Sequence, residues 1–162
     1  MTTMTSMLVK LTTVGLTGLA LTAVGVYPQL SARLTGDEIR LRVAPVDPID
    51  PFRGAYVDLQ YPDLNRLGGR GPRGIGGESG DVFITLRQED DLWVADAWTR
   101  TRPEDGLYLA CSDRTWEVRC GIESWFLPQD EAAAMEDAVG DGAVATVKVD
   151  GRGYAAIVDV EG

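Results

Sequence analysis

Residues 11–27 form an apolar run that a water-soluble domain cannot readily accommodate. They read LTTVGLTGLALTAVGVY and contain no charged side chain. A bilayer-spanning helix needs about 20 predominantly apolar residues, so this run lies near the short end of the spanning range. It is apolar on all sides and lacks the polar face of a helix that packs onto a soluble domain. We therefore predict that residues 1–35 comprise an N-terminal tail, a transmembrane anchor and a connector.

A cleaved signal peptide is the alternative interpretation of the same run. Lys10 would be its positive region, and Ala23-Val24-Gly25 would offer the small residues of a cleavage site. The apolar run continues past that site to Tyr27, an aromatic residue of the kind enriched at membrane interfaces. This continuation favours a retained signal-anchor and a single-pass location in the cell membrane.

Composition narrows the functions open to residues 36–162. The chain of 162 residues has 25 acidic and 15 basic side chains, with a net charge of −10 at pH 7. This charge repels phosphate backbones, so nucleic acid is not an expected partner. The chain has no histidine, and its two lysines are Lys10 and Lys148, so the commonest general bases are scarce. Residues 36–162 have the length of one domain with its own core.

Most of this domain alternates polar and apolar side chains with the period of a strand. Turn residues separate the segments, so neighbouring segments should form antiparallel hairpins. The predicted strands are residues 38–43, 55–61, 81–87, 92–99, 107–111, 115–120, 122–127, 144–149 and 154–160.

Two other segments complete the predicted fold. Residues 129–139 favour a helix, with acidic residues in the first turn and alanines in the middle. Residues 67–80 hold seven glycines and favour a surface loop. We predict a mainly β (α+β) fold: an N-terminal transmembrane helix, then an antiparallel sheet or partial barrel with one short helix.

Residues 45–61, PVDPIDPFRGAYVDLQY, organise this domain. Pro45, Pro48 and Pro51 fix φ and keep the preceding residues out of the helical region, so the segment begins as a stiff connector. Gly54 permits a turn, and a half-buried strand follows.

Two carboxylates lie between these prolines. Asp47 and Asp50 could approach a metal, but calcium takes about six to eight oxygen ligands and two carboxylates supply too few. We expect them to accept hydrogen bonds from turn amides or to pair with Arg53, which makes all three structural or docking candidates. No metal or cofactor is expected.

The same segment carries a family resemblance. Gly54, Tyr56, Leu59 and Tyr61 match the pattern of the bacterial GDYXXLXY protein family, and residues 121–128 (GIESWFLP) are similar to a second segment of that family. The resemblance covers about residues 38–162. It implies a protein of unknown function with a single membrane anchor.

One departure from the family pattern bears on chemistry. Ala55 stands where the pattern has aspartate, so a role that needs that carboxylate is lost or moved. The resemblance also implies a polytopic membrane protein as the partner, because genes for such proteins often lie beside those of the family. In the second segment, Trp125 and Phe126 are docking candidates.

The side of the membrane is predicted from the cysteines and the resemblance. Three arginines follow the apolar run and only Lys10 and the terminal amine precede it, which alone would favour a cytoplasmic domain. Long segments, however, translocate largely regardless of charge. We place residues 36–162 outside the cytoplasm.

The two cysteines, Cys111 and Cys120, flank one predicted turn. In an oxidising compartment they are expected to form a disulfide. Two buried free thiols are the alternative, because a simple hairpin register does not place them directly opposite.

A membrane-anchored hydrolase is the enzymatic alternative. Residues 52–57 (FRGAYV) resemble a strand opening of type I signal peptidases, which have a β-rich extracytoplasmic fold, a serine nucleophile after the anchor and a lysine base. Here Ser31 follows the apolar run, but the only lysine beyond it is Lys148, on a strand face expected to be solvated. This alternative rests on a likeness of fold.

The interpretation that we prefer is a non-catalytic extracytoplasmic module that binds or supports a partner at the membrane. A small-ligand domain is a further alternative, with an aromatic pocket around Tyr56, Tyr61, Trp125 and Phe126. Under the preferred interpretation the motif residues set a turn and fill the two faces of a strand.

Overall fold

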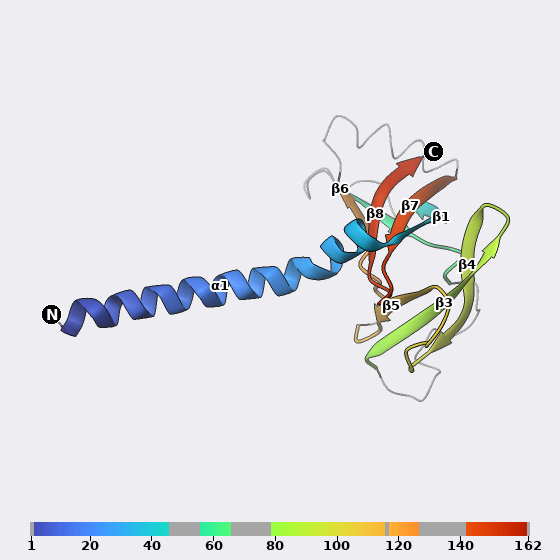
Figure 1. The fold of residues 1–162 in the computed structure, drawn as a ribbon. Helices are drawn as coiled ribbons and strands as arrows, with labels where there is room; N and C mark the ends of the chain where they lie inside the picture. Colours follow the sequence, from blue (N-terminus) through green and yellow to red (C-terminus); the bar gives the residue numbers. More distant parts are fainter. Residues whose placement is uncertain (1, 46–55, 66–78, 116, 127–141, 162) are drawn as a thin grey trace.

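The computed structural model describes residues 2–45, 56–65, 79–115, 117–126 and 142–161. These residues form one helix and eight strands in two antiparallel sheets (Figure 1). The elements are α1 (Thr2–Thr35), β1 (Asp37–Pro45), β2 (Tyr56–Gln60), β3 (Asp81–Glu89), β4 (Leu92–Thr99), β5 (Tyr108–Ser112), β6 (Ser124–Phe126), β7 (Ala143–Val149) and β8 (Ala155–Glu161). The predicted mainly β fold with an N-terminal helix is confirmed. The helix predicted at 129–139 lies outside the described residues, as does the glycine-rich stretch up to residue 78.

β1 is the central strand of a five-stranded sheet with the order β6-β2-β1-β7-β8. Its alternation decides which face is buried: Ile39, Leu41 and Val43 point into the core, whereas Arg40 and Arg42 are exposed. β1 pairs with β7, and β7 pairs with β8 as the predicted C-terminal hairpin. The sequence pattern therefore identified these strands correctly, although the β7–β8 register shifts between Thr146 and Val147.

A bulge in the three-stranded sheet, ordered β4-β3-β5, changes one predicted face. Strict alternation places Ala95 and Ala97 together on the inner face of β4. The register shifts, however, because Leu86 pairs with Ala95 whereas Thr85 pairs with Ala97. β4 thus contains one extra residue, which moves the side chains beyond it to the opposite face. Ala95 is buried and Ala97 is exposed, so the prediction was wrong for Ala97.

The hairpin predicted between residues 107–111 and 115–120 is also corrected. β5 pairs with β3, and the described part of residues 115–120 makes one isolated bridge, between Ser112 and Arg119. The two backbone hydrogen bonds of that bridge, each 2.8 Å, return the chain beside the end of β5.

One hydrophobic core joins the two sheets. Its largest fully buried side chains come from the five-stranded sheet, from the three-stranded sheet and from the segment before β6. Among them are Leu41, Ile84, Leu109, Ile122 and Val147. Each large aliphatic side chain contributes about 1.5–3 kcal/mol on burial, so this shared core holds the sheets together as one unit.

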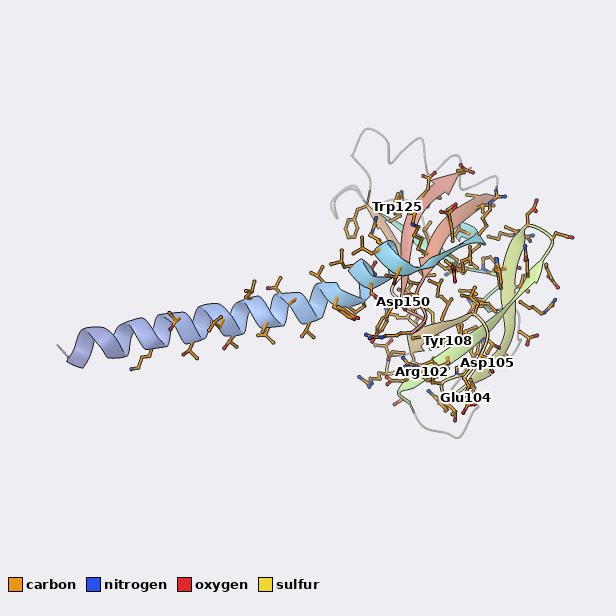
Figure 2. The ribbon with its side chains drawn as sticks, in the orientation of Figure 1. Arg102, Glu104, Asp105, Tyr108, Trp125 and Asp150 are labelled. Atoms are coloured by element: carbon orange, nitrogen blue, oxygen red, sulfur yellow. A yellow bond between two sulfur atoms is a disulfide. The ribbon has the colours of Figure 1, made fainter. Side chains whose placement is uncertain are left out.

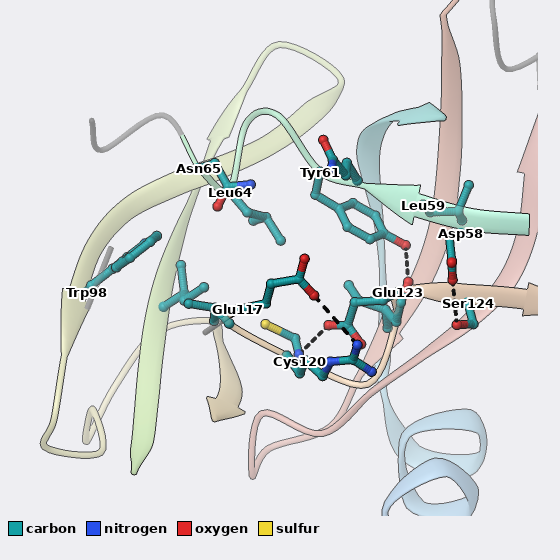
Figure 3. Close-up of a pocket in the computed structure, with 15 residues that line it drawn as sticks. Asp58, Leu59, Tyr61, Leu64, Asn65, Trp98, Glu117, Cys120, Glu123 and Ser124 are labelled. Atoms are coloured by element: carbon teal, nitrogen blue, oxygen red, sulfur yellow. Dashed lines mark hydrogen bonds and ion pairs between the residues drawn. The ribbon is translucent and has the colours of Figure 1, made fainter. Parts of the chain in front are cut away.

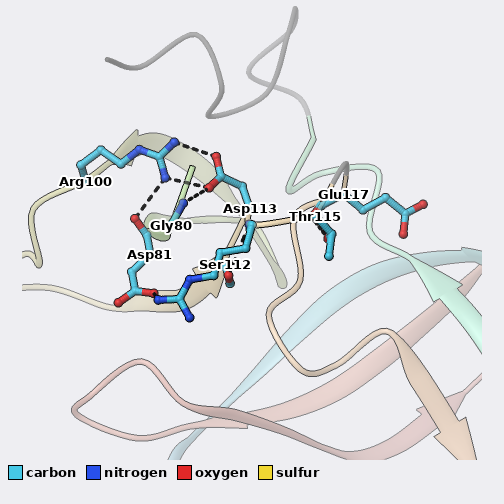
Figure 4. Close-up of polar contacts among 8 residues, drawn as sticks. Gly80, Asp81, Arg100, Ser112, Asp113, Thr115 and Glu117 are labelled. Carbon is cyan, nitrogen blue, oxygen red and sulfur yellow. Dashed lines mark hydrogen bonds and ion pairs between the residues drawn. The ribbon is translucent and has the colours of Figure 1, made fainter. Parts of the chain in front are cut away.

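A buried ion pair fastens the end of β4 to the chain after β5. Arg100 Nη2 lies 2.7 Å from Asp113 Oδ2, and Arg100 Nη1 donates to Asp113 Oδ1 at 2.9 Å (Figure 4). The Gly80 N–H donates to the same carboxylate at 2.7 Å. The hydrogen bonds from Arg100 lower the pKa of Asp113 to about 2, although burial alone would raise it.

Asp113→Asn should destabilise the protein at neutral pH and have little effect in acid. The folded pKa of about 2 is below the ordinary aspartate value of about 3.9, so the carboxylate stabilises the fold above about pH 4 and loses this effect as the pH falls toward 2. In urea unfolding, the variant should be less stable than wild type by about 3 kcal/mol at pH 7, with a smaller difference at pH 3. Asp81→Asn is the control, because Asp81 pairs with Arg114 at 3.0 Å on the surface, where such pairs contribute little. A difference for Asp113→Asn that does not change with pH would contradict this account.

The last two turns of α1 pack on the β-rich domain. The connector predicted before Gly36 is helical through Thr35, even though Pro28 lies inside the helix. Ala32 is fully buried. Three side chains of this part of the helix donate hydrogen bonds to the domain: Gln29 Nε2 to Gly121 O at 3.0 Å, Ser31 Oγ to Asp150 Oδ2, and Arg33 Nη2 to Ile157 O at 2.9 Å.

Gly36 lets α1 and β1 approach β7 closely. Its N–H donates to Ala32 O at 2.9 Å, which closes the last helical turn. A Cβ at this position would lie 2.4 Å from Ala32 O and 2.8 Å from Val149 N. Both contacts involve backbone atoms, so a larger residue would require the helix or the sheet to shift.

Gly36→Ala should therefore lower the free energy of unfolding by about 1–3 kcal/mol. Gly151→Ala is the matched control, because a Cβ on Gly151 meets nothing within 4 Å. Thermal unfolding of the full chain in detergent measures both variants. If the Gly36→Ala and Gly151→Ala proteins were equally stable, the close packing at the helix–sheet junction would not contribute to the stability of the fold.

Candidate functional site

A groove of about 510 Å³ opens between β2 and residues 117–124 (Figure 3). Leu64, Ile84 and Trp98 contribute apolar surface to its lining, and the first two are buried. Trp98 comes from β4, beyond the bulge, where it pairs with Ile84 on β3. Both sheets therefore contribute to one concave surface.

The two sequence blocks that resemble the GDYXXLXY family meet at this groove. β2 pairs antiparallel with β6, and Val57 lies opposite Trp125. The Leu59 N–H donates to Glu123 O at 2.8 Å, which extends the pairing to the residue before β6. Ser124 Oγ donates to Asp58 Oδ1 at 3.2 Å on the exposed side. Segments that are far apart in the sequence thus form one wall.

Leu59 and Tyr61 are the motif residues that the structure places in the core. They are 3% and 5% exposed. The Tyr61 hydroxyl donates to Ile122 O at 2.7 Å (Figure 3). Burial, together with the nearby Glu123 carboxylate, raises the pKa of Tyr61 well above its usual range. Tyr61 therefore stays neutral and acts as a hydrogen-bond donor that fixes the 121–124 segment.

The Glu123 carboxylate caps the turn that leads into β6. It accepts hydrogen bonds from the N–H groups of Cys120 and Gly121, the latter at 3.1 Å. Gly121 has a φ of 83°, a conformation that favours glycine, so the turn depends on both residues. This contact gives the glutamate two residues after Gly121 a structural role in the second sequence block.

A disulfide closes the segment that carries the groove wall. The Sγ atoms of Cys111 and Cys120 lie 2.04 Å apart, at bonding distance, as the sequence predicted. Cys111 is on β5 and Cys120 lines the groove. The bond connects the wall directly to the three-stranded sheet.

Two charged side chains are available at the rim. Glu117 and Arg119 lie 3.6 Å apart, and their side chains are 44% and 63% exposed. Such an exposed pair contributes little to stability, so both charges can be redirected toward a partner. Among the described residues, no three His, Cys, Asp or Glu side chains are grouped as a metal site would require.

Trp125 and Phe126 are not part of the groove lining. Trp125 is half-buried and Phe126 is 76% exposed, both on the edge strand β6. The structure therefore does not bring Tyr61, Trp125 and Phe126 together as one aromatic pocket. Tyr56 belongs to β2 and pairs through its backbone with Phe126. Asp47, Asp50, Arg53 and Gly54 lie outside the described residues, as does Ala55.

Sequence reasoning missed Trp98, Glu117, Arg119 and Glu123 as groove residues. The bulge concealed Trp98, because alternation alone assigns the wrong face beyond it. For Glu123, the signal was present in the glycine-isoleucine-glutamate block.

The serine and lysine that the hydrolase alternative requires, Ser31 and Lys148, each form a hydrogen bond with another residue. Ser31 Oγ donates to Asp150, and Lys148 Nζ donates to Arg33 O at 3.5 Å. Ser31 is thus a fastening residue at the base of α1, and its hydrogen-bond partner is a carboxylate.

The fold and the groove define a β-rich domain carried by one N-terminal helix, of which Thr12–Thr35 is long and apolar enough to cross a membrane. The family model described as GDYXXLXY protein matches residues 18–160, and the chain belongs to this family. No curated protein and no solved structure matches it.

Leu59→Ala should destabilise the domain by about 2–5 kcal/mol, because Leu59 is buried and its loss leaves a cavity behind the groove. Gln60→Ala is the matched control, since Gln60 is the exposed neighbour on the same strand. Urea unfolding of the two variants measures the difference. A Leu59→Ala protein as stable as Gln60→Ala would show that the motif strand does not support the core.

Proposed function

We propose that this protein is a single-pass membrane protein whose domain lies outside the cytoplasm and binds a polytopic membrane protein through the groove, without catalysis. The position of the groove beside α1 carries the proposal. Gln29 in α1 donates to Gly121 O at 3.0 Å, and the neighbouring residues Cys120 and Ile122 line the groove. The groove is therefore close to the base of the anchor, within reach of a protein in the same membrane.

The chemistry of the groove supports binding. Glu123 is occupied by two backbone N–H groups and Tyr61 by a carbonyl, and the raised pKa of Tyr61 makes it a poor base near neutral pH. The chain has no histidine. Tyr61 and Glu123 thus hold the shape of the groove and are not free to transfer protons.

The surface also has the arrangement of a small protein interface. An apolar centre around Ile84 and Trp98 is bordered by the charged pair Glu117–Arg119. A volume of about 510 Å³ is enough to receive side chains from a partner loop. The disulfide supports the extracytoplasmic side, because such bonds persist in oxidising compartments.

Cross-linking from the groove tests partner and sidedness together. A membrane-impermeant maleimide photo-cross-linker, added to spheroplasts that produce the full-length Gln60→Cys protein, should react and yield an adduct with a polytopic protein. Gln60 lines the groove and is exposed. Asp91→Cys, in the β3–β4 turn, should react but give no adduct. Failure of both variants to react would place the domain in the cytoplasm.

A second test reverses one arginine at the rim of the groove and, as its control, one arginine outside the groove. Arg119→Glu should reduce the yield of the Gln60→Cys adduct about tenfold, because a negative group of the partner that faces Arg119 would then meet a negative charge. Arg114→Glu should leave the yield unchanged. Both arginines are exposed, but Arg114 pairs with Asp81 outside the groove. Equal yields for the two variants would exclude the groove as the binding surface. An adduct with a small molecule in place of a protein would favour the ligand-binding alternative.

A further inference from the structure

The docked end of α1 limits how far the domain can stand from the bilayer. Residues 28–35 lie on the domain, with Ala32 fully buried, and Lys10 bounds the apolar run at its other end. The part of α1 left to cross the hydrocarbon is therefore the uncharged run 11–27. At 1.5 Å per residue this run is about 26 Å long. The hydrocarbon core is about 30 Å thick. A span shorter than the core draws its flanking groups toward the membrane surface.

A tyrosine and an arginine meet at the point where the run ends. Arg152 Nη1 donates to the Tyr27 hydroxyl at 2.7 Å, and its guanidinium carbon lies 5.4 Å from the centre of the Tyr27 ring. Tyrosine favours the interfacial level of a membrane. Because Arg152 is in the turn between β7 and β8, this contact brings part of the domain to the same depth as Tyr27.

A second arginine reaches the same turn. Arg102 Nη2 donates to Arg152 O at 3.3 Å, and both side chains are exposed. Figure 2 shows Arg102 and Asp150 on the side of the domain from which α1 projects. The acidic neighbours are Asp150, which is buried and accepts hydrogen bonds from Ser31 and from the Arg152 N–H, and the exposed Glu104 and Asp105 of the adjoining loop.

We propose that this face of the domain rests on the bilayer and that Arg152 and Arg102 bind the phosphate groups of lipid headgroups; this inference rests on the proposed membrane anchor. An arginine presents five N–H donors in a planar fork, and one contact with Tyr27 leaves most of them for phosphate oxygens. The net charge of −10 repels an anionic surface as a whole. The arginine face therefore selects the orientation in which the domain meets the membrane.

The test uses the full-length protein in vesicles of phosphatidylcholine, with or without phosphatidylglycerol. A fluorophore is attached at Gly151→Cys, next to Arg152, where a Cβ has open space. The control is the same fluorophore at Asp91→Cys, in the β3–β4 turn, which is distant from α1 (Figure 1). Lipids that carry a nitroxide on the headgroup quench fluorophores at the membrane surface. We expect strong quenching at position 151 and weak quenching at position 91, with more quenching at 151 when phosphatidylglycerol is present.

Arg152→Glu should shift the equilibrium away from the docked orientation by about fivefold or more, since one arginine near an anionic surface contributes about that factor. Arg87→Glu, an exposed arginine on β3, should leave quenching unchanged. A protein that floats with the vesicles but is quenched equally at 151 and 91 would overturn this inference and leave the anchor standing. Quenching at 151 that is insensitive to Arg152→Glu would overturn the phosphate contact. A protein that does not float with vesicles would overturn the anchor itself.

Discussion

The pairing of β1 with its neighbours is the constraint on which the rest of the structure depends. β1 begins directly after Gly36, so the direction of α1 is set where β1 enters the sheet. On one side β1 pairs with β7, against which the end of α1 packs, and on the other with β2, which forms a wall of the groove. One alternating strand thus determines the core, the helix junction and the groove. Any change that displaces β1 would alter all three together.

Polar groups near the groove mainly shape its backbone. Buried donors and acceptors are costly unless they are paired, so Tyr61, Glu123 and the bridge at Ser112 fix a segment that has little regular secondary structure. The disulfide adds a covalent restraint on the same segment. An irregular wall held in this way can present exposed side chains such as Arg119 in a defined position. Under the proposed function, a surface that is ordered in advance lowers the conformational cost of binding.

Sequence reasoning succeeded for strands in which the two-residue alternation alone decides which side chains are buried. The alternation of β1 and β7 identified buried residues such as Leu41 and Val147, because both strands alternate regularly over one core. In β8 the alternation breaks, since the β7–β8 register shifts between Thr146 and Val147. It failed where geometry depends on a partner strand. The bulge that exposes Ala97 and turns Trp98 toward the groove is a property of the β3–β4 register, which no local pattern records. For the same reason, the packing of residues 28–35 on the domain had no signature, since their contacts, such as Gln29 with Gly121, join distant parts of the chain.

The helix junction links the length of the apolar run to the position of the groove. If α1 ended in a flexible connector, a short span would affect only the local bilayer. Here the hydrogen bonds of Gln29 and Arg33 transmit the position of the helix to the sheet and to the turn at Gly121. If α1 spans a membrane as proposed, the depth of the span sets the height of the groove above the membrane, and lengthening the run by one turn would raise the groove by about 5 Å. The polytopic partner proposed above would have to present a loop at this height, so under that proposal the length of the anchor limits which membrane proteins can bind.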